Sequence, residues 1–202
     1  MENVGKRYSR GWVFRSVSDE IQPGEAIAIL GPNGSGKSTL LRILSGSVTP
    51  SQGKVDYELE GKKLKDEQVY MNMTIAAPYL ELVEEYTLEE QVAFHFRFKQ
   101  VVKGVEQSQV PDLLLLGEDR AKPIKEYSSG MLQRVKLGLA ILSDTPLVLL
   151  DEPTTNLDAG GIEWYNKIID EYTMNRTVVV CSNRRDQEYH FCAREIIMEN
   201  YR

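Results

Sequence analysis

The feature that most constrains the fold is a glycine-rich segment with an apolar run on either side. The segment reads, in order, Gly31, Pro32, Asn33, Gly34, Ser35, Gly36, Lys37, Ser38 and Thr39. Residues 26–30 before it are all apolar, which is typical of a buried strand. Residues 40–44 after it carry apolar side chains at helical spacing. The sequence therefore predicts a strand, a tight loop and a helix in direct succession.

The spacing within this segment matches the phosphate-binding pattern G-x-x-x-x-G-K-S. Glycines let backbone N–H groups close around phosphate oxygens without a Cβ clash, and the start of the helix adds unpaired N–H groups and a positive dipole end. We expect Lys37 to reach the β- and γ-phosphates of a nucleotide and the Ser38 hydroxyl to bind Mg²⁺. The alternative is a glycine-rich turn that only caps a helix, and it does not explain the flanking pattern.

A second apolar run ends in two carboxylates. Residues 147–150 are followed directly by Asp151 and Glu152, as in a buried parallel strand with acidic groups at its carboxyl end. Ligands gather at that end in open α/β sheets. Asp151 can hold Mg²⁺ directly or through water, and Glu152 can orient or deprotonate a water for in-line attack on phosphorus. The alternative, a strand ending in a solvated acidic turn, is weakened by the phosphate-binding pattern upstream.

Length and composition limit the classes of protein that fit. The chain has 202 residues, of which 42% are hydrophobic, so it can form one large domain with a core. Its net charge of −6 argues against a general nucleic-acid binder, because phosphate backbones require a basic face. The two cysteines predict no disulfide framework and suit a reducing cytosol. The sequence also predicts no signal peptide and no membrane span.

Other segments predict the surrounding elements. Thr87 and Glu90 fit a capping box at the start of a helix, although residues 94–99 also alternate with period two, so a strand is the alternative there. His95 is expected to be exposed. We further predict an edge strand over residues 55–59, helical core over residues 113–116, and buried strands over residues 178–181 and 196–198.

Two further regions are candidates for ligand contact. Ser128, Ser129 and Gly130 precede a helix that is apolar at positions 132, 135, 139 and 142, and a helix start of this kind is a potential anion site. Taken alone, the segment is better explained by ordinary N-capping. Tyr8 and Phe14 could stack on an adenine ring, or they could be ordinary core or surface aromatics.

Together, these motifs resemble those of the ATP-binding subunit of an ABC transporter, over nearly the whole chain. Residues 31–39 look like the Walker A motif, and residues 147–151 look like Walker B with Glu152 at the place of the catalytic glutamate. Residues 127–131, followed by Gln133-Arg134, look like a degenerate L-S-G-G-Q signature. Motifs in this order and spacing are highly specific.

Two smaller matches complete the resemblance. Residues 155–158, which end in Asp158, look like the D-loop, and Tyr8 lies at the position of the aromatic residue that stacks on adenine. The resemblance implies an α/β fold: a RecA-like P-loop NTPase core with an N-terminal antiparallel β part and an inserted α-helical subdomain. We expect one domain, with its core in residues 1–77 and 143–202 and the helical subdomain, carrying the signature, in residues 78–142.

The resemblance also implies cofactors and partners. ATP and Mg²⁺ would be held between the Walker A segment of one subunit and Ser128, Ser129 and Gly130 of a second, in a head-to-tail dimer, either of two identical or of two different subunits. Asp158 would lie at the same interface. A transmembrane permease subunit would dock on the helical side, so the chain would be cytoplasmic and peripheral on the inner face of the cell membrane. No nucleic-acid partner is expected.

The chain departs from the family pattern at several positions. Ser129 and Met131 replace the first Gly of the signature and its Gln, and Ala77-Pro78 stands where a Gln is expected. Asn183 replaces the switch histidine after the strand at residues 178–181. Asparagine can donate a hydrogen bond to a γ-phosphate but cannot carry charge. Slow hydrolysis, or cycling that depends on a partner, is therefore predicted.

Three functions follow from these observations. The first is an ATPase subunit that powers a membrane transporter, with the exporters of the ABC-2 or heme-exporter kind as the nearest type. The second is an ATP-switched binding module with very slow hydrolysis, favoured by Asn183 and opposed by Glu152. The third is a non-transport ABC ATPase of translation or DNA repair. Its usual paired cassettes, coiled-coil inserts or basic surfaces are not evident in the sequence.

Overall fold

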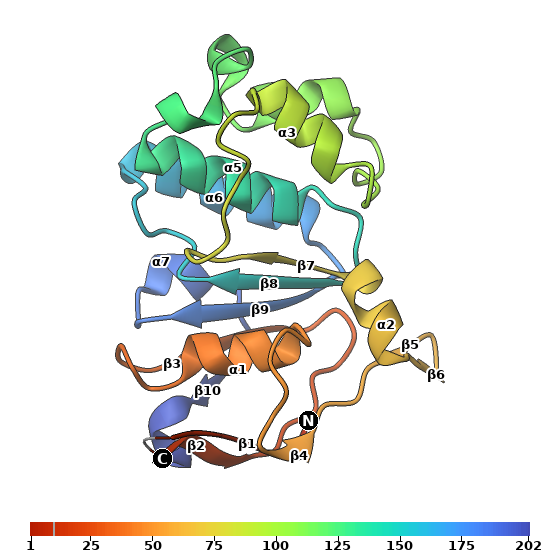
Figure 1. Ribbon diagram of the computed structural model, residues 1–202, viewed down its shortest axis with the longest axis vertical. Helices are drawn as coiled ribbons and strands as arrows, with labels where there is room; N and C mark the ends of the chain where they lie inside the picture. Colours follow the sequence, from red (N-terminus) through yellow and green to blue (C-terminus); the bar gives the residue numbers. More distant parts are fainter. Residues whose placement is uncertain (10) are drawn as a thin grey trace.

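The structure, a computed structural model, describes residues 1–9 and 11–202. Its centre is a parallel sheet in the order β10-β3-β9-β8-β7. The strands are β3 (Ala26–Leu30), β7 (Met73–Ala76), β8 (Leu147–Asp151), β9 (Thr177–Ser182) and β10 (Arg194–Ile197). Helices cover one face, and a helix and a small antiparallel sheet cover the other (Figure 1). The strands predicted over residues 26–30, 147–150 and 178–181 are confirmed.

Successive residues of the central strands pack into two separate cores. Leu149 and Val179 pack with α1 (Lys37–Leu44) and the antiparallel sheet, whereas Val148, Leu150 and Val178 pack with α5 (Ser129–Ile141) and α6 (Ala159–Tyr172). Both faces of the sheet are thus buried, which explains why its strands are continuous apolar runs in the sequence.

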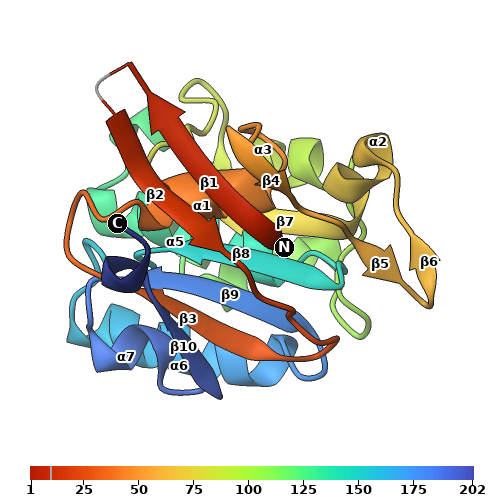
Figure 2. The same cartoon turned by 90° about the horizontal axis from the view of Figure 1, so that it is seen from below.

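The first residues form the antiparallel sheet, in the order β2-β1-β4 (Figure 2). Its strands are β1 (Glu2–Tyr8), β2 (Gly11–Val17) and β4 (Gln52–Lys54). Phe14 is fully buried beneath this sheet, which excludes it as a base-stacking residue and leaves Tyr8.

The edge strand predicted over residues 55–59 is wrong. Strand β4 ends before it, and only β5 (Glu58–Leu59) forms a short ribbon, with β6 (Lys62–Lys63). Tyr57 turns inward instead, where its hydroxyl donates to the Leu44 carbonyl at 2.7 Å. Two short helical turns, α2 (Asp66–Val69) and η1 (Tyr70–Asn72), then lead into β7.

Between β7 and β8 the named elements are all helical. They are α3 (Leu88–His95), η2 (Gln107–Gln109), α4 (Val110–Leu113), η3 (Gly117–Asp119), η4 (Ile124–Glu126) and α5. The capping box at the start of α3 is confirmed, since Glu90 N donates to Thr87 Oγ1 and Thr87 N donates to Glu90 Oε2. In the described residues, no helix has both the length and the apolar character that crossing a membrane requires.

Two predictions in this helical part are wrong. His95 is not exposed: its Nε2 lies 2.8 Å from Ser143 Oγ, and burial lowers its pKa to about 4. The apolar run at residues 113–116 is not continuous helix, because α4 ends at Leu113. Leu115 has φ 57° and is 61% exposed, so only part of this run joins the core.

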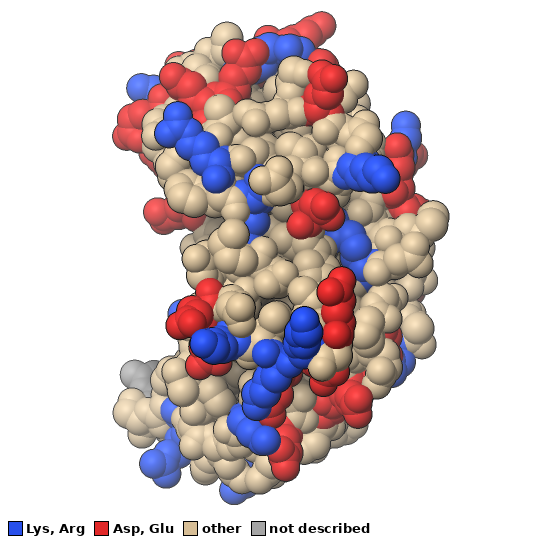
Figure 3. Space-filling model, turned by 90° about the vertical axis from the view of Figure 1, so that its right-hand side faces the viewer, with Lys and Arg blue, Asp and Glu red and all other residues tan. Residues whose placement is uncertain are grey.

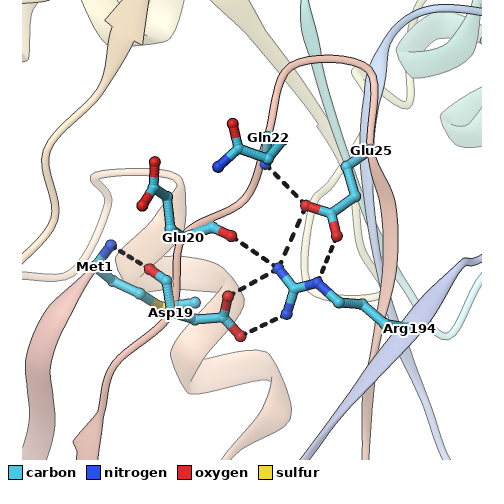
Figure 4. A network of polar contacts seen from close by, with 6 residues as sticks. All are labelled: Met1, Asp19, Glu20, Gln22, Glu25 and Arg194. Carbon is cyan, nitrogen blue, oxygen red and sulfur yellow. Dashed lines mark hydrogen bonds and ion pairs between the residues drawn. The ribbon is translucent and has the colours of Figure 1, made fainter.

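The chain ends with α7 (Asp186–Tyr189), β10 and η5 (Met198–Tyr201), so the strand predicted over residues 196–198 begins earlier and ends at Ile197. Arg194, at the amino end of β10, donates two hydrogen bonds to Asp19 at 2.7 and 2.8 Å and also bonds Glu25, just before β3 (Figure 4). Elsewhere on the surface, Figure 3 shows acidic and basic side chains mixed over one face.

Candidate functional site

The glycine-rich segment forms the turn between β3 and α1 at the carboxyl-terminal edge of the sheet. Gly36, at the N-cap of α1, has φ 103° and provides no side-chain cap. A Cβ at this position would lie 2.8 Å from the ring of Phe14 and 2.9 Å from the Val13 side chain, so β2 leaves room only for glycine. Among the described residues, the first N–H groups of α1 thus have no side-chain cap, which is the arrangement that binds an anion.

Lys37 begins α1 and folds back over this turn. Its Nζ donates to the carbonyl oxygens of Gly31 at 2.8 Å and Pro32 at 3.3 Å. The same nitrogen lies 3.9 Å from Oε1 of Glu152, although Lys37 follows β3 and Glu152 follows β8. The side chain of Lys37 is only 4% exposed, so its charge is held inside the loop where a phosphate would enter.

Asp151 is the last residue of β8 and is 2% exposed. Its Oδ1 has no hydrogen-bond partner among the described residues. Burial raises the pKa of Asp151, and a hydrogen bond from Ser38 opposes that rise. A buried carboxylate oxygen left without a partner, beside a hydroxyl, fits a hard cation that takes few protein ligands and completes its shell with water and phosphate. Ser38 and Asp151 together therefore suit Mg²⁺.

Glu152 follows in a strained backbone conformation. Its φ is 46°, which is uncommon for a residue other than glycine and occurs preferentially at functional positions. The backbone N–H of Glu152 donates to the Cys181 carbonyl at 2.9 Å, and Thr155 Oγ1 lies 3.5 Å from its Oε2. This conformation directs the carboxylate back toward Lys37 instead of along the strand.

The predicted signature lies at the start of α5. Ser128 is the N-cap and accepts a hydrogen bond from Met131 N at 3.3 Å, so the capping alternative holds, while Ser128 and Ser129 remain exposed. In the described part of the chain, no hydrogen bond or ion pair joins these residues to residues 31–39. Instead, Gln133 Nε2 donates to the Pro153 carbonyl at 2.8 Å, which ties α5 to the loop after Glu152.

The remaining predicted residues lie around this edge. Asn183 follows β9 and is exposed. Asp158 caps α6 by accepting from Gly161 N at 2.7 Å, and its side chain is 82% exposed. Tyr8 is 48% exposed and, with Trp12, lines a surface hollow of about 670 Å³ on the antiparallel sheet. The structure thus brings Lys37, Ser38, Asp151 and Glu152 together and leaves the others facing outward.

Sequence reasoning missed two side chains here. Tyr79 follows β7, and its ring lies 5.5 Å from the Arg42 guanidinium, one turn along α1 from Ser38. Burial raises the pKa of Tyr79 to about 12, and the Asp151 charge adds to the rise. Glu188 in α7 is fully buried. The proline before Tyr79 marks a turn after the preceding strand, which is a local indication for Tyr79. The polar run around Glu188 contains no such indication.

Fold and site together define a P-loop ATPase, and comparisons with known proteins place it in a family. The ABC transporter family model matches residues 14–155. The cytochrome c biogenesis ATP-binding export protein CcmA of Haemophilus influenzae is 30% identical over 190 residues, which cover 92% of this chain and 88% of that protein. The lantibiotic transport ATP-binding protein SrtF of Streptococcus pyogenes is 29% identical over 188 residues, which cover 91% and 78%.

A solved dimeric ATP-binding cassette, bound to ADP and phosphate in a post-hydrolysis state, matches with a TM-score of 0.82 and 25% identity over 97% of this chain and 92% of that one. This chain belongs to the ABC transporter family and is an ATP-binding cassette ATPase. The resemblance drawn from its motifs is confirmed, as is the predicted α/β fold with a P-loop NTPase core and an antiparallel β part.

Proposed function

We propose that this chain is the ATP-hydrolysing subunit of an ABC exporter. The observation that carries the proposal is the convergence of Lys37, Asp151 and Glu152 at one edge of the sheet, with Lys37 Nζ 3.9 Å from Glu152 and one Asp151 oxygen without a hydrogen-bond partner in the described part of the chain. Relatives named as a cytochrome c biogenesis ATP-binding export protein and a lantibiotic transport ATP-binding protein support the exporter type. The cargo would be selected by the membrane subunit.

Each side chain has a defined task in this proposal. The N–H groups at the start of α1, together with Lys37, bind the β- and γ-phosphates, and Tyr8 stacks on the adenine. Ser38 and Asp151 hold Mg²⁺, which when bound neutralises phosphate charge. Glu152 accepts a proton from the attacking water, and Asn183 donates a hydrogen bond toward the γ-phosphate. These roles rest on the positions of the side chains at the strand ends.

A second subunit completes the site. The helix start at Ser128, Ser129 and Gly130 has both serines exposed, and within the described residues no hydrogen bond or ion pair joins it to the phosphate loop of the same chain. We propose that they bind the γ-phosphate of ATP held by a partner cassette, with Asp158 at the same interface; the dimeric state of the matched solved structure supports this arrangement. Closure would then require ATP, and hydrolysis would release it.

The remaining assignments follow from the same proposal. Residues 78–142, which hold the helices between β7 and β8, form the helical subdomain, and residues 1–77 and 143–202 form the core. A transmembrane permease subunit docks on the helical side. The chain would then lie on the cytoplasmic face of the cell membrane.

A second candidate function is an ATP-operated switch that hardly turns over. Asn183 favours it, because a neutral amide replaces the histidine of the family pattern. Steady-state phosphate release by the wild type and by Glu152→Gln separates the two functions. An ATPase subunit loses about 100-fold or more in rate with the substitution, the effect of removing a general base. A negligible wild-type rate that the substitution leaves unchanged supports the switch.

A further inference from the structure

A buried carboxylate that has no task in the proposal above lies behind the site. Glu188, in α7, is 0% exposed. Its Oε1 accepts hydrogen bonds from Thr154 Oγ1 at 2.7 Å and from Thr154 N at 3.2 Å. Its Oε2 accepts a hydrogen bond from Ser182 Oγ at 2.5 Å. Within the described residues, hydroxyl and amide groups are its hydrogen-bond donors, and no Lys or Arg forms an ion pair with it.

These contacts join two segments that carry predicted functional residues. Thr154 lies two residues after Glu152, in the loop between β8 and α6. Ser182 ends β9 and directly precedes Asn183. Thr154 is 2% exposed and Ser182 is 0% exposed, so the bridge is shielded from water. A charged acceptor binds such hydroxyl donors more strongly than a neutral one does. The carboxylate therefore links the Glu152 loop to the strand end at Asn183.

The local structure holds Glu188 itself in place. Tyr165 Oη, from α6, donates to the backbone carbonyl of Glu188 at 2.9 Å. Arg185 N donates to Ser182 Oγ at 3.1 Å, which leaves the hydroxyl proton of Ser182 directed at the carboxylate. Burying a carboxylate without a cation costs free energy that a neutral residue would avoid. The need to hold the Glu152 loop and the strand end at Asn183 in fixed positions gives a reason for this cost.

We propose that Glu188 is a positioning residue for ATP hydrolysis: it fixes the loop that carries Glu152 against the strand end that carries Asn183. In this proposal, Glu152 and Asn183 approach the γ-phosphate from two different segments. The distance between them must therefore stay constant while the water is activated. Small displacements of groups that orient a reaction cost large factors in rate. The inference rests on the proposed ATPase function and adds to it a residue outside the nucleotide pocket.

Kinetics of the full-length chain test this proposal. Glu188→Gln keeps the shape of the side chain but turns one acceptor into a donor that faces Thr154 or Ser182. Thr154→Val removes one hydroxyl from the same bridge and leaves the Glu188 side chain itself unchanged. We expect kcat for ATP hydrolysis to fall about tenfold in each variant. We expect KM for ATP, and the Kd of a fluorescent ATP analogue measured without hydrolysis, to stay within about twofold.

Tyr165→Phe is the matched control, because it removes a hydrogen bond at the same buried location and leaves the carboxylate bridge intact. We expect it to lower Tm but not kcat. If kcat falls in all three variants in proportion to the loss in Tm, Glu188 has only a structural role and the proposal is wrong. It is equally wrong if Glu188→Gln and Thr154→Val both keep the wild-type kcat. A wild-type chain that binds no ATP overturns the proposed function as well.

Discussion

At the amino-terminal edge of the parallel sheet, Arg194 donates hydrogen bonds to Asp19 and Glu25 (Figure 4), whereas at the carboxyl-terminal edge one buried oxygen of Asp151 has no hydrogen-bond partner among the residues that the structure describes. The two edges belong to the same strands and differ in how their charged groups are satisfied. Glu152, beside Asp151, adds a left-handed backbone conformation with φ 46°. Charge is neutralised within the protein at one edge and left available at the other.

This difference between the two sheet edges separates charged groups that stabilise the fold from groups that are available to bind a ligand. A buried polar atom without a partner lowers stability, and so does a strained backbone. Both occur at the edge where parallel α/β sheets bind ligands. The amino-terminal edge carries more charged side chains in direct contact, yet it offers no free acceptor for a cation within the network of Arg194, Asp19 and Glu25.

Loss of the phosphate-binding charge is expected to have the largest effect. Lys37→Ala removes the cation that lies inside the loop and should weaken ATP binding by about 100-fold or more, since a buried charge-assisted contact contributes about 3 kcal/mol. The Kd of a fluorescent ATP analogue at equilibrium measures this loss of affinity. Lys62→Ala, on the exposed ribbon strand β6, is the control and should bind as the wild type does. Equal affinity in both variants would exclude the site.

A substitution of the unpartnered carboxylate sharpens the contrast between stability and function. Asp151→Asn removes a charge whose burial is unfavourable, so the free energy of unfolding without nucleotide should rise by about 1 to 2 kcal/mol, and Tm should rise with it. The same substitution should abolish the dependence of ATP affinity on Mg²⁺. Thermal unfolding with and without ATP, at zero and millimolar Mg²⁺, measures both effects. A variant that is destabilised but keeps its Mg²⁺ dependence would contradict the assignment.

The amino-terminal edge is expected to respond in the opposite way. The Arg194 guanidinium lowers the pKa of Glu25 from its usual 4.5. A lowered pKa stabilises the fold above the unfolded value, and this stabilisation is lost as pH falls below about 4.5. Arg194→Gln should therefore lower stability by about 1 to 2 kcal/mol at neutral pH and less below pH 4. Denaturant unfolding at pH 7 and pH 3.5 measures this, and an undiminished difference at pH 3.5 would contradict it.

Local signals in the sequence were sufficient for the strands and loops that form the carboxyl-terminal edge. The apolar runs of β3, β8 and β9 and the capping box of Thr87 and Glu90 depend on neighbours in the chain, and the structure confirms them. The proximity of Lys37 and Glu152 could be expected only after both residues had been placed at the carboxyl-terminal edge of the sheet.

What could not be predicted depends on distant contacts. His95 is half-buried, with Ser143 Oγ 2.8 Å from its ring nitrogen, and Glu188 is fully buried, with Thr154 and Ser182 donating to it. Neither side chain differs from an exposed one in its local sequence. Residues 55–59 alternate as a strand does, but β4 and its pairing end at Lys54. Tyr57 instead donates a hydrogen bond to the Leu44 carbonyl at the end of α1.

The smallest expected effect concerns the end of β9, where Asn183 is exposed and neutral. Asn183→His would place a group that can carry charge near the γ-phosphate, and a charge-assisted hydrogen bond exceeds a neutral one by about 1 kcal/mol, or about fivefold in rate. We expect kcat for ATP hydrolysis to rise by that factor with little change in KM. Asn183→Ala should lower kcat. An unchanged rate in both variants would mean that Asn183 does not face the nucleotide, and that β9 contributes to this edge only through the Ser182–Glu188 bridge.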